Sequence, residues 1–133
     1  MILTLDFSSD IPIYIQIRNQ MVQAMADGRL KNGERLPTVR ALAGEAGINS
    51  MTVNKAYQMM KQEGYIITDR RNGAAVCFSN GENNEAKNKI MEKFRLTIAE
   101  AKVNGMTEEE IVNFCREIYR CDESDKKEKG GGD

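Results

Sequence analysis

The spacing of apolar residues changes several times along the chain, and each change marks an expected element. Residues 2–7, ILTLDF, alternate apolar and polar positions, which favours a short strand. Residues 13–25 repeat apolar side chains every four positions, which predicts an amphipathic helix. Pro12 suits the first turn of this helix, with Asp10 just before it, and Gly28 suits its end. The expected core stripe consists of Ile13, Ile17, Met21 and Met25.

Two further helices are expected on either side of a glycine. Thr38 is placed to cap the first, which Gly47 ends, and Asn49 is placed to cap the second, which runs from about Ser50 to Glu63. Gly64 ends the second helix, since glycine accepts the left-handed conformation at a helix terminus. Their apolar faces are formed by Val39, Leu42, Ala43 and Ala46, and by Val53, Ala56, Tyr57 and Met60.

A β-hairpin is expected next. YIITD and AAVCF read as its two strands, and RRNG stands between them. Asn72-Gly73 is a strong hairpin signal because both residues accept positive φ. The element order is therefore helix, helix, turn, helix, hairpin, a winged helix-turn-helix domain over residues 1–78.

The rest of the chain predicts a polar linker at residues 79–85, a helical region at 86–121 and a disordered tail at 122–133. Gly105 separates two helices, and Thr107 with a glutamate three positions later forms a capping box for the second. Two isolated helices this short cannot bury their apolar faces alone, so we expect them to pair with those of a second copy. The interface residues predicted on this basis are Ile90, Phe94, Ile98, Ile111, Phe114 and Ile118. The expected fold class is mainly α with one small hairpin.

The composition offers little catalytic chemistry. There is no histidine, which removes the commonest general base and zinc ligand. Neither a phosphate-binding GxxxxGK[ST] loop nor a GxGxxG motif occurs, and the three cysteines include no CxxC pair. The sequence therefore predicts no enzyme, no cofactor and no metal site.

Charge and hydropathy limit the kinds of partner that the chain can have. The net charge is −1, but residues 1–80 hold nine Lys or Arg against seven Asp or Glu, and residues 81–133 hold ten against thirteen. A mildly basic front and an acidic back suggest two different roles. No apolar stretch is long enough to span a membrane, and the start lacks the features of a signal peptide, so we expect a cytosolic protein.

The two short helices have the spacing of a helix-turn-helix. Ala43, Gly47 and Val53 allow the helices to cross closely, and the polar start of the second helix then projects outward. Arg70 and Arg71 would stand at the tip of the hairpin, as on a wing that touches the DNA backbone or minor groove. Caps, a turn and solvated charges explain each residue singly, whereas their joint arrangement favours DNA binding. The polar start is formed by Asn49, Ser50, Met51, Thr52, Asn54 and Lys55.

The stretch LPTVRALAGEAGINSMTVNKAYQMMKQEGYI resembles the DNA-binding domain of GntR-family bacterial transcription regulators, and PIYIQIRNQM resembles the first helix of that domain. The match covers about residues 8–78. GMTEEEIVNF and the two-helix tail are similar to the YtrA subfamily, whose members lack a large effector domain and dimerise through such helices. By this resemblance Arg40 would contact phosphate or guanine, residues 49–52 would form the first recognition turn, and Gly73 would be the wing glycine. The chain departs from the family pattern at Met51, at Arg71 and at Ala74-Ala75-Val76.

The resemblance implies a homodimeric repressor on a palindromic operator, which controls an operon for an ABC transporter and its own gene. It specifies no small-molecule effector. Two alternatives stay open: a winged-helix module that binds proteins instead of DNA, and a sensor gated by an effector or by oxidation of Cys77.

Overall fold

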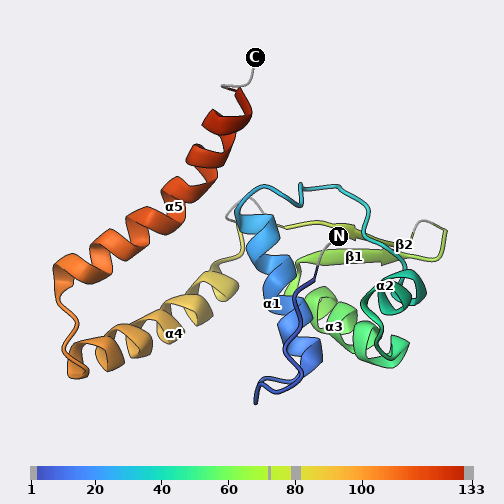
Figure 1. The fold of residues 1–133 in the computed structure, drawn as a ribbon, viewed down its shortest axis with the longest axis horizontal. Coiled ribbons are helices and arrows are strands. Elements are labelled where there is room, and N and C mark those ends of the chain that lie inside the picture. The colour runs from blue at the N-terminus through green and yellow to red at the C-terminus, as the bar shows by residue number, and fades with distance from the viewer. Residues whose placement is uncertain (1–2, 72, 79–81, 131–133) are drawn as a thin grey trace. The chain divides into compact units, whose positions relative to one another are not determined.

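The computed structural model describes residues 3–71, 73–78 and 82–130, and the chain divides into two compact units, residues 1–80 and 81–133 (Figure 1). The first unit contains three helices and one antiparallel hairpin, and the second contains two helices. The elements are α1 (Ile13–Ala26), α2 (Val39–Ala46), α3 (Ser50–Glu63), β1 (Ile66–Asp69), β2 (Gly73–Val76), α4 (Asn84–Val103) and α5 (Glu108–Gly130).

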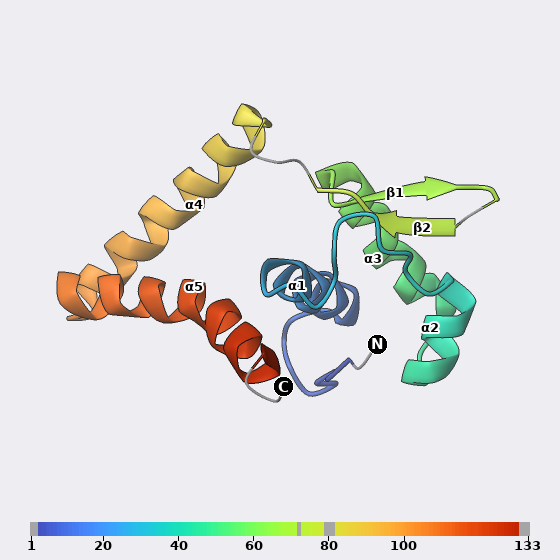
Figure 2. The ribbon, with the colours of Figure 1, turned by 90° about the horizontal axis from the view of Figure 1, so that it is seen from above.

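The core of the first unit lies where α1, α2 and α3 meet and where the hairpin covers them (Figure 2). Of the predicted α1 stripe, Ile17, Met21 and Met25 are buried and Ile13 is partly buried. The expected face of α3 is also buried. The side chains that are most completely enclosed are Ile17, Met21, Leu42, Met60, Ile66, Val53 and Val76.

The helix ends follow the local signals in the sequence. Thr38 Oγ1 accepts a hydrogen bond of 3.0 Å from the Ala41 amide at the start of α2, and Asn49 Oδ1 accepts one of 2.8 Å from the Met51 amide at the start of α3. Gly47 adopts φ 70°, the left-handed conformation that ends α2 and sets the turn into α3. By contrast, α1 begins after Pro12 without a side-chain cap.

The N-terminal segment is not the strand that its alternating pattern predicted. Leu3 and Leu5 do face the core, but the backbone of this segment pairs with two side chains of α1. The Gln16 amide group donates to the Asp6 carbonyl and accepts from the Asp6 amide, at 2.9 and 2.8 Å. Gln20 exchanges the same pair of bonds with Thr4. Two glutamines thus replace the missing neighbouring strand, so a strand-like pattern appears without a sheet.

The hairpin forms where the sequence predicted it, and its second strand pairs along both edges. Strands β1 and β2 pair from Ile66↔Val76 to Asp69↔Gly73, so residues 70–72 of the RRNG segment separate them and Gly73 already belongs to β2. Gly73 has φ 73° and opens β2, a left-handed conformation that favours glycine. Asn72 itself lies outside the described residues. The loop before α2 hydrogen-bonds along the other edge of β2, with a bridge between Arg35 and Ala75.

Tyr57 joins this loop to α3. The side chain is buried, and its hydroxyl donates a 2.7 Å hydrogen bond to the carbonyl of Pro37, directly before the cap of α2. Burial raises the pKa of the Tyr57 phenol to about 12. Because only the neutral phenol donates this bond, α2 is fixed to α3 while Tyr57 keeps its proton.

Stability is therefore expected to fall between pH 10 and pH 12. In this range the unfolded chain releases the Tyr57 proton while the folded chain retains it, which lowers the free energy of unfolding by about 2 kcal/mol. Tyr57→Phe should cost about 1 kcal/mol at pH 8, where it leaves the Pro37 carbonyl without its donor. That difference should vanish or reverse by pH 12. Urea unfolding of both proteins across this range measures it, and parallel pH profiles would contradict the assignment.

The second unit keeps its helices largely exposed. Asn83 caps α4 by accepting from the Ala86 amide, so the helix begins at Asn84, inside the segment expected to be linker. Thr107 Oγ1 accepts from the Glu110 amide at 3.1 Å, as the capping-box motif predicted. The structure also continues α5 to Gly130, beyond the tail boundary expected at residue 121. The intervening residues are mostly Lys, Glu and Asp, and no helix-breaking residue occurs before the glycines.

Along the described part of the chain, none of the helices combines the length and the apolar character that crossing a membrane requires.

Candidate nucleic-acid interface

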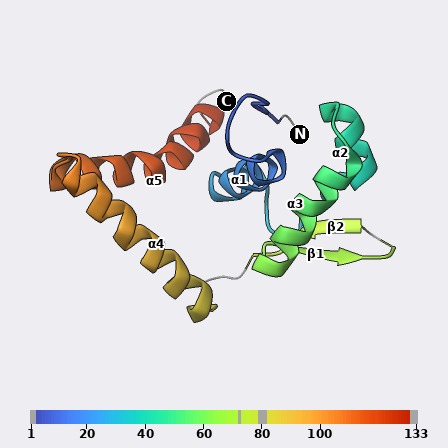
Figure 3. The same cartoon turned by 90° about the horizontal axis from the view of Figure 1, so that it is seen from below.

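One end of the first unit gathers the elements that the sequence singled out. α2 and α3 are joined by the turn at Gly47, and Ala43 and Val53 are buried where the two helices cross. Figure 3 shows α2, the start of α3 and the tip of the hairpin at the same end of the unit, and Figures 1 and 2 agree. A helix start, a neighbouring helix and a wing tip therefore share one surface.

The first turns of α3 present polar and flexible side chains to solvent. Ser50, Met51, Asn54 and Lys55 are exposed, and Thr52 is partly buried. Met51 is 76% exposed, which leaves its side chain available for contact. Asn49 caps the helix with its side-chain oxygen Oδ1, and its side-chain NH₂ group stays free to donate elsewhere.

Asp69, which the sequence interpretation had not singled out, shapes the wing tip. Its Oδ1 accepts a 2.9 Å hydrogen bond from the Arg71 amide, which closes the turn at the end of β1. Arg70, Arg71 and Gly73 are all exposed. The carboxylate thus folds the loop while the two guanidinium groups that follow it extend from the tip. An aspartate at the start of a turn, whose carboxylate can accept from the amide two residues later, is the local signal that predicts this hydrogen bond.

Two arginines of this unit that lie outside the candidate surface are paired with carboxylates. Arg18 forms a bidentate ion pair with Glu63 at the last turn of α3, with a shortest distance of 2.8 Å, and Glu63 raises the pKa of Arg18. Arg29 pairs with Asp27 at 2.9 Å. Within the described residues, no carboxylate lies within ion-pair distance of the cations on the candidate surface. These cations are Arg40, Lys55, Arg70 and Arg71.

Lys55 has a different neighbour, which sequence reasoning did not find. Its ammonium lies 4.1 Å from the centroid of the Tyr14 ring on α1. Ile13, Met51 and Thr52 line the same shallow hollow, of about 430 Å³. The two partners are far apart in the sequence, so no local pattern signals the contact.

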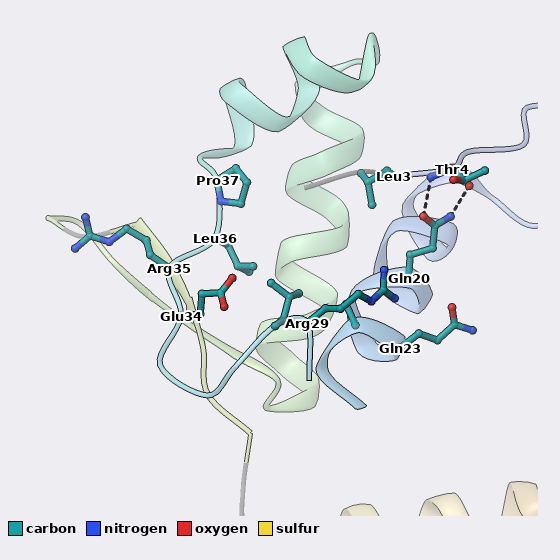
Figure 4. Close-up of a pocket in the computed structure, with 11 residues that line it drawn as sticks. Leu3, Thr4, Gln20, Gln23, Arg29, Glu34, Arg35, Leu36 and Pro37 are labelled. Atoms are coloured by element: carbon teal, nitrogen blue, oxygen red, sulfur yellow. Dashed lines mark hydrogen bonds between the residues drawn. The ribbon is translucent and has the colours of Figure 1, made fainter. Parts of the chain in front are cut away.

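A larger hollow of about 900 Å³ lies beside the N-terminal segment and the loop before α2 (Figure 4). Its floor is apolar, with Leu30 and Leu36 buried beneath it. Several polar groups on its walls already have partners within the protein. Gln20 is engaged with Thr4, and Arg29 with Asp27. This hollow therefore presents fewer uncommitted groups than the surface around α3.

Neither hollow has the donor set of a metal site. Within the described residues, no group of three or more His, Cys, Asp or Glu side chains is arranged to hold a metal ion.

The second unit leaves large apolar side chains in contact with solvent. No described residue of α4 is buried, although the helix carries a continuous apolar stripe. The predicted stripe residues of α4 are Ile90, Phe94 and Ile98, which are 51%, 44% and 38% exposed. On α5, Ile111 is partly buried, and Phe114 and Ile118 are 58% and 57% exposed. So much apolar surface is typical of a protein–protein interface.

Comparison with known proteins gives a consistent family. The model for bacterial regulatory proteins, gntR family, matches residues 13–76. The HTH-type transcriptional repressor YtrA of Bacillus subtilis (strain 168) is 34% identical over 117 residues, which cover 86% of this chain and 89% of that protein.

Two solved structures extend the likeness to both units. A transcriptional antiterminator from Listeria monocytogenes EGD-e has a TM-score of 0.80 at 27% identity and covers 90% of this chain and 93% of its own. YtrA from Sulfolobus acidocaldarius, described as a GntR-family transcription factor, has a TM-score of 0.58 at 35% identity and covers 87% and 95%.

Proposed function

This chain belongs to the GntR family and is a transcription regulator, and from that premise we propose that it acts as a homodimeric repressor on palindromic duplex DNA. The observation that carries the proposal is the distribution of positive charge. The cations around the start of α3 and the wing have no carboxylate partner among the described residues, while Arg18 and Arg29 are neutralised elsewhere. Unpaired cations on one surface attract the phosphate backbone, which supplies most of the affinity of proteins for DNA.

In this proposal the start of α3 enters the major groove. Ser50, Met51, Thr52 and Asn54 face the base edges, and the amide of Asn49 donates to a base or phosphate. Arg40, in the first turn of α2, contacts phosphate or guanine. The wing, with Arg70, Arg71 and Gly73, follows the backbone beside the groove.

The proposed dimer forms through residues 86–121, while residues 1–78 bind DNA. The support is the apolar stripe of α4 and α5, most of whose described side chains are exposed. A second copy offers the same stripe, so a two-fold axis would bury both at once. Two recognition helices then lie about 34 Å apart, one turn of DNA, which requires a palindromic site.

The sign of regulation is inferred from a relative, and the regulated genes from the resemblance of the sequence to the YtrA subfamily. YtrA of Bacillus subtilis is named a repressor, and this chain spans most of its length. We propose that this protein is also a repressor and that it controls an operon that encodes an ABC transporter and the protein itself. A dimer bound across the promoter would block polymerase without any catalytic chemistry.

Fluorescence anisotropy tests the proposed function. The full-length protein is titrated onto duplex DNA from upstream of its own gene, onto a scrambled duplex, and onto an RNA duplex of the promoter sequence. We expect tight binding to the promoter that weakens roughly a thousandfold between 50 and 200 mM salt, as for about six phosphate contacts. The RNA duplex should not bind specifically, because its major groove is too narrow and deep for a helix.

Equal, weak and salt-independent binding to all three duplexes would contradict the proposal. A protein-binding role on the same scaffold would then be the better account. Preference for the RNA duplex would instead indicate that the α3 surface does not read B-form DNA.

A further inference from the structure

Tyr14 and Lys55 connect the first turn of α1 to the exposed side of α3. The Lys55 ammonium lies 4.1 Å from the centroid of the Tyr14 ring, well within the roughly 6 Å over which a ring attracts a cation. Beneath this contact the helices are held rigidly. Ile17 on α1 and Val53 on α3 are both 0% exposed. The tyrosine ring is therefore carried on a helix that packs closely against α3.

A lysine is otherwise a poor candidate for a fixed contact. Its four-carbon stem is flexible, and an exposed lysine explores many rotamers that it must lose on binding. Within the described residues no carboxylate competes for the Lys55 ammonium. The ring of Tyr14 thus limits the positions of the ammonium before any ligand arrives, while its N–H groups stay exposed to donate.

The position of the pair favours a phosphate as the ligand. Lys55 lies one turn beyond the first residues of α3, and the ring draws its ammonium toward α1, to the flank of the helix. The groove floor lies ahead of a recognition helix, and the backbone lies along its flanks. The hollow that the pair shares with Met51 and Thr52 is shallow and open, which suits a phosphate edge better than an inserted base.

We propose that Tyr14 is a positioning residue of the DNA interface, whose ring holds the Lys55 ammonium ready for a backbone phosphate. This role rests on the proposed function, because it needs duplex DNA as the ligand. It assigns to α1 a part in DNA binding that goes beyond its place in the core.

A double-mutant cycle tests the coupling. The variants are Tyr14→Leu, which removes the ring, Tyr14→Phe, which keeps the ring without the hydroxyl, Lys55→Met, and the Tyr14→Leu/Lys55→Met double variant. Tyr14→Leu should weaken promoter binding about three- to fivefold in the wild-type background. In the Lys55→Met background it should have almost no effect, and Tyr14→Phe should bind like wild type. Lys55→Met should reduce the salt slope by about 0.9, the value of one phosphate.

A readout without DNA separates this role from the proposed function. The ring current of Tyr14 should shift the Lys55 ε-methylene proton resonances upfield in the wild type and in Tyr14→Phe, and the shift should be lost in Tyr14→Leu. Thermal unfolding identifies any variant that fails to fold, and Tyr14→Met then replaces Tyr14→Leu.

Two results would overturn the inference. Effects of Tyr14→Leu and Lys55→Met that multiply independently would mean that Tyr14 does not act through Lys55. Wild-type resonances without a ring-current shift would mean that the contact is not populated in solution. If the wild type binds no DNA while the shift is present, the proposed function fails and the DNA role of Tyr14 fails with it, although the contact itself stands.

Discussion

Phe94→Asp is expected to convert the proposed dimer into monomers. Phe94 lies in the middle of the α4 stripe and is 44% exposed in the single chain, so its exposed part is available to a second copy. A second copy can bury only the exposed part of each Phe94 side chain, which contributes about 1 kcal/mol per subunit and about 2 kcal/mol in a two-fold interface that contains the residue twice. Burying an unpaired carboxylate in each subunit costs several kcal/mol more, so the substitution should raise the dimer dissociation constant by roughly a thousandfold or more. Sedimentation velocity over a concentration series measures this constant.

Leu96→Asp provides the matched control. Leu96 is 63% exposed on the same helix, but two residues of an α-helix correspond to about 200°, so it faces away from the stripe. It should leave the dimer intact. Because neither side chain belongs to the core, both variants should retain the wild-type circular dichroism spectrum. A Phe94→Asp protein that sediments as a stable dimer would remove α4 from the interface.

Arg40→Ala is expected to weaken DNA binding about tenfold at every sequence. Arg40 is exposed in the first turn of α2 and has no ion-pair partner among the described residues, so its charge is available to phosphate. Removal of one phosphate contact should lower the salt slope by about 0.9. Anisotropy titrations on promoter and scrambled duplexes, at four salt concentrations, measure both quantities.

Two variants decide what Arg40 contacts. Lys61→Ala removes an equal charge from the last turn of α3, far from the candidate surface, and should leave the slope unchanged. Arg40→Lys keeps the charge but loses the planar fork that pairs with guanine. Near-normal binding by Arg40→Lys indicates a phosphate contact, and loss of promoter preference indicates a guanine contact. If Arg40→Ala binds like Lys61→Ala, Arg40 lies outside the interface.

Local signals were sufficient for the three helices of the first unit. The predicted bounds of α3 agree with the structure because the Asn49 side chain and the Gly64 amide mark its ends through hydrogen bonds within one turn. The apolar stripe of α1 could be predicted because a helix that packs one face against the core repeats apolar residues at helical spacing. These features depend on residues a few positions apart, so the sequence contains them directly.

Contacts between segments far apart in the chain could not be predicted from the sequence. The segment before α1 has the alternation of a strand, but its backbone partners are Gln16 and Gln20, and nothing local distinguishes these glutamines from solvated ones. The Tyr57–Pro37 hydrogen bond likewise joins segments that only the folded chain brings together. No local signal marks the boundary between α5 and the tail, because a charged composition fits both a disordered tail and a solvent-exposed helix.

In the candidate site, too, local features could be predicted and long-range contacts could not. The helix-turn-helix spacing identified the start of α3, because the turn at Gly47 is a local requirement. The contact between Tyr14 and Lys55 was missed because it depends on how α1 packs against α3. Which bases Met51 and Asn54 would contact in the proposed complex depends in turn on the DNA sequence, which the protein sequence does not contain.

Hydroxyl-radical footprinting of the full-length protein on the promoter DNA tests the central claim most directly, since it reports binding and symmetry together. A dimer with two recognition helices about 34 Å apart should protect two patches, one DNA turn apart and related by two-fold symmetry. Phe94→Asp should lose both patches at the concentration that saturates wild type. A single patch, or uniform weak protection at all concentrations, would contradict a dimeric, sequence-specific repressor.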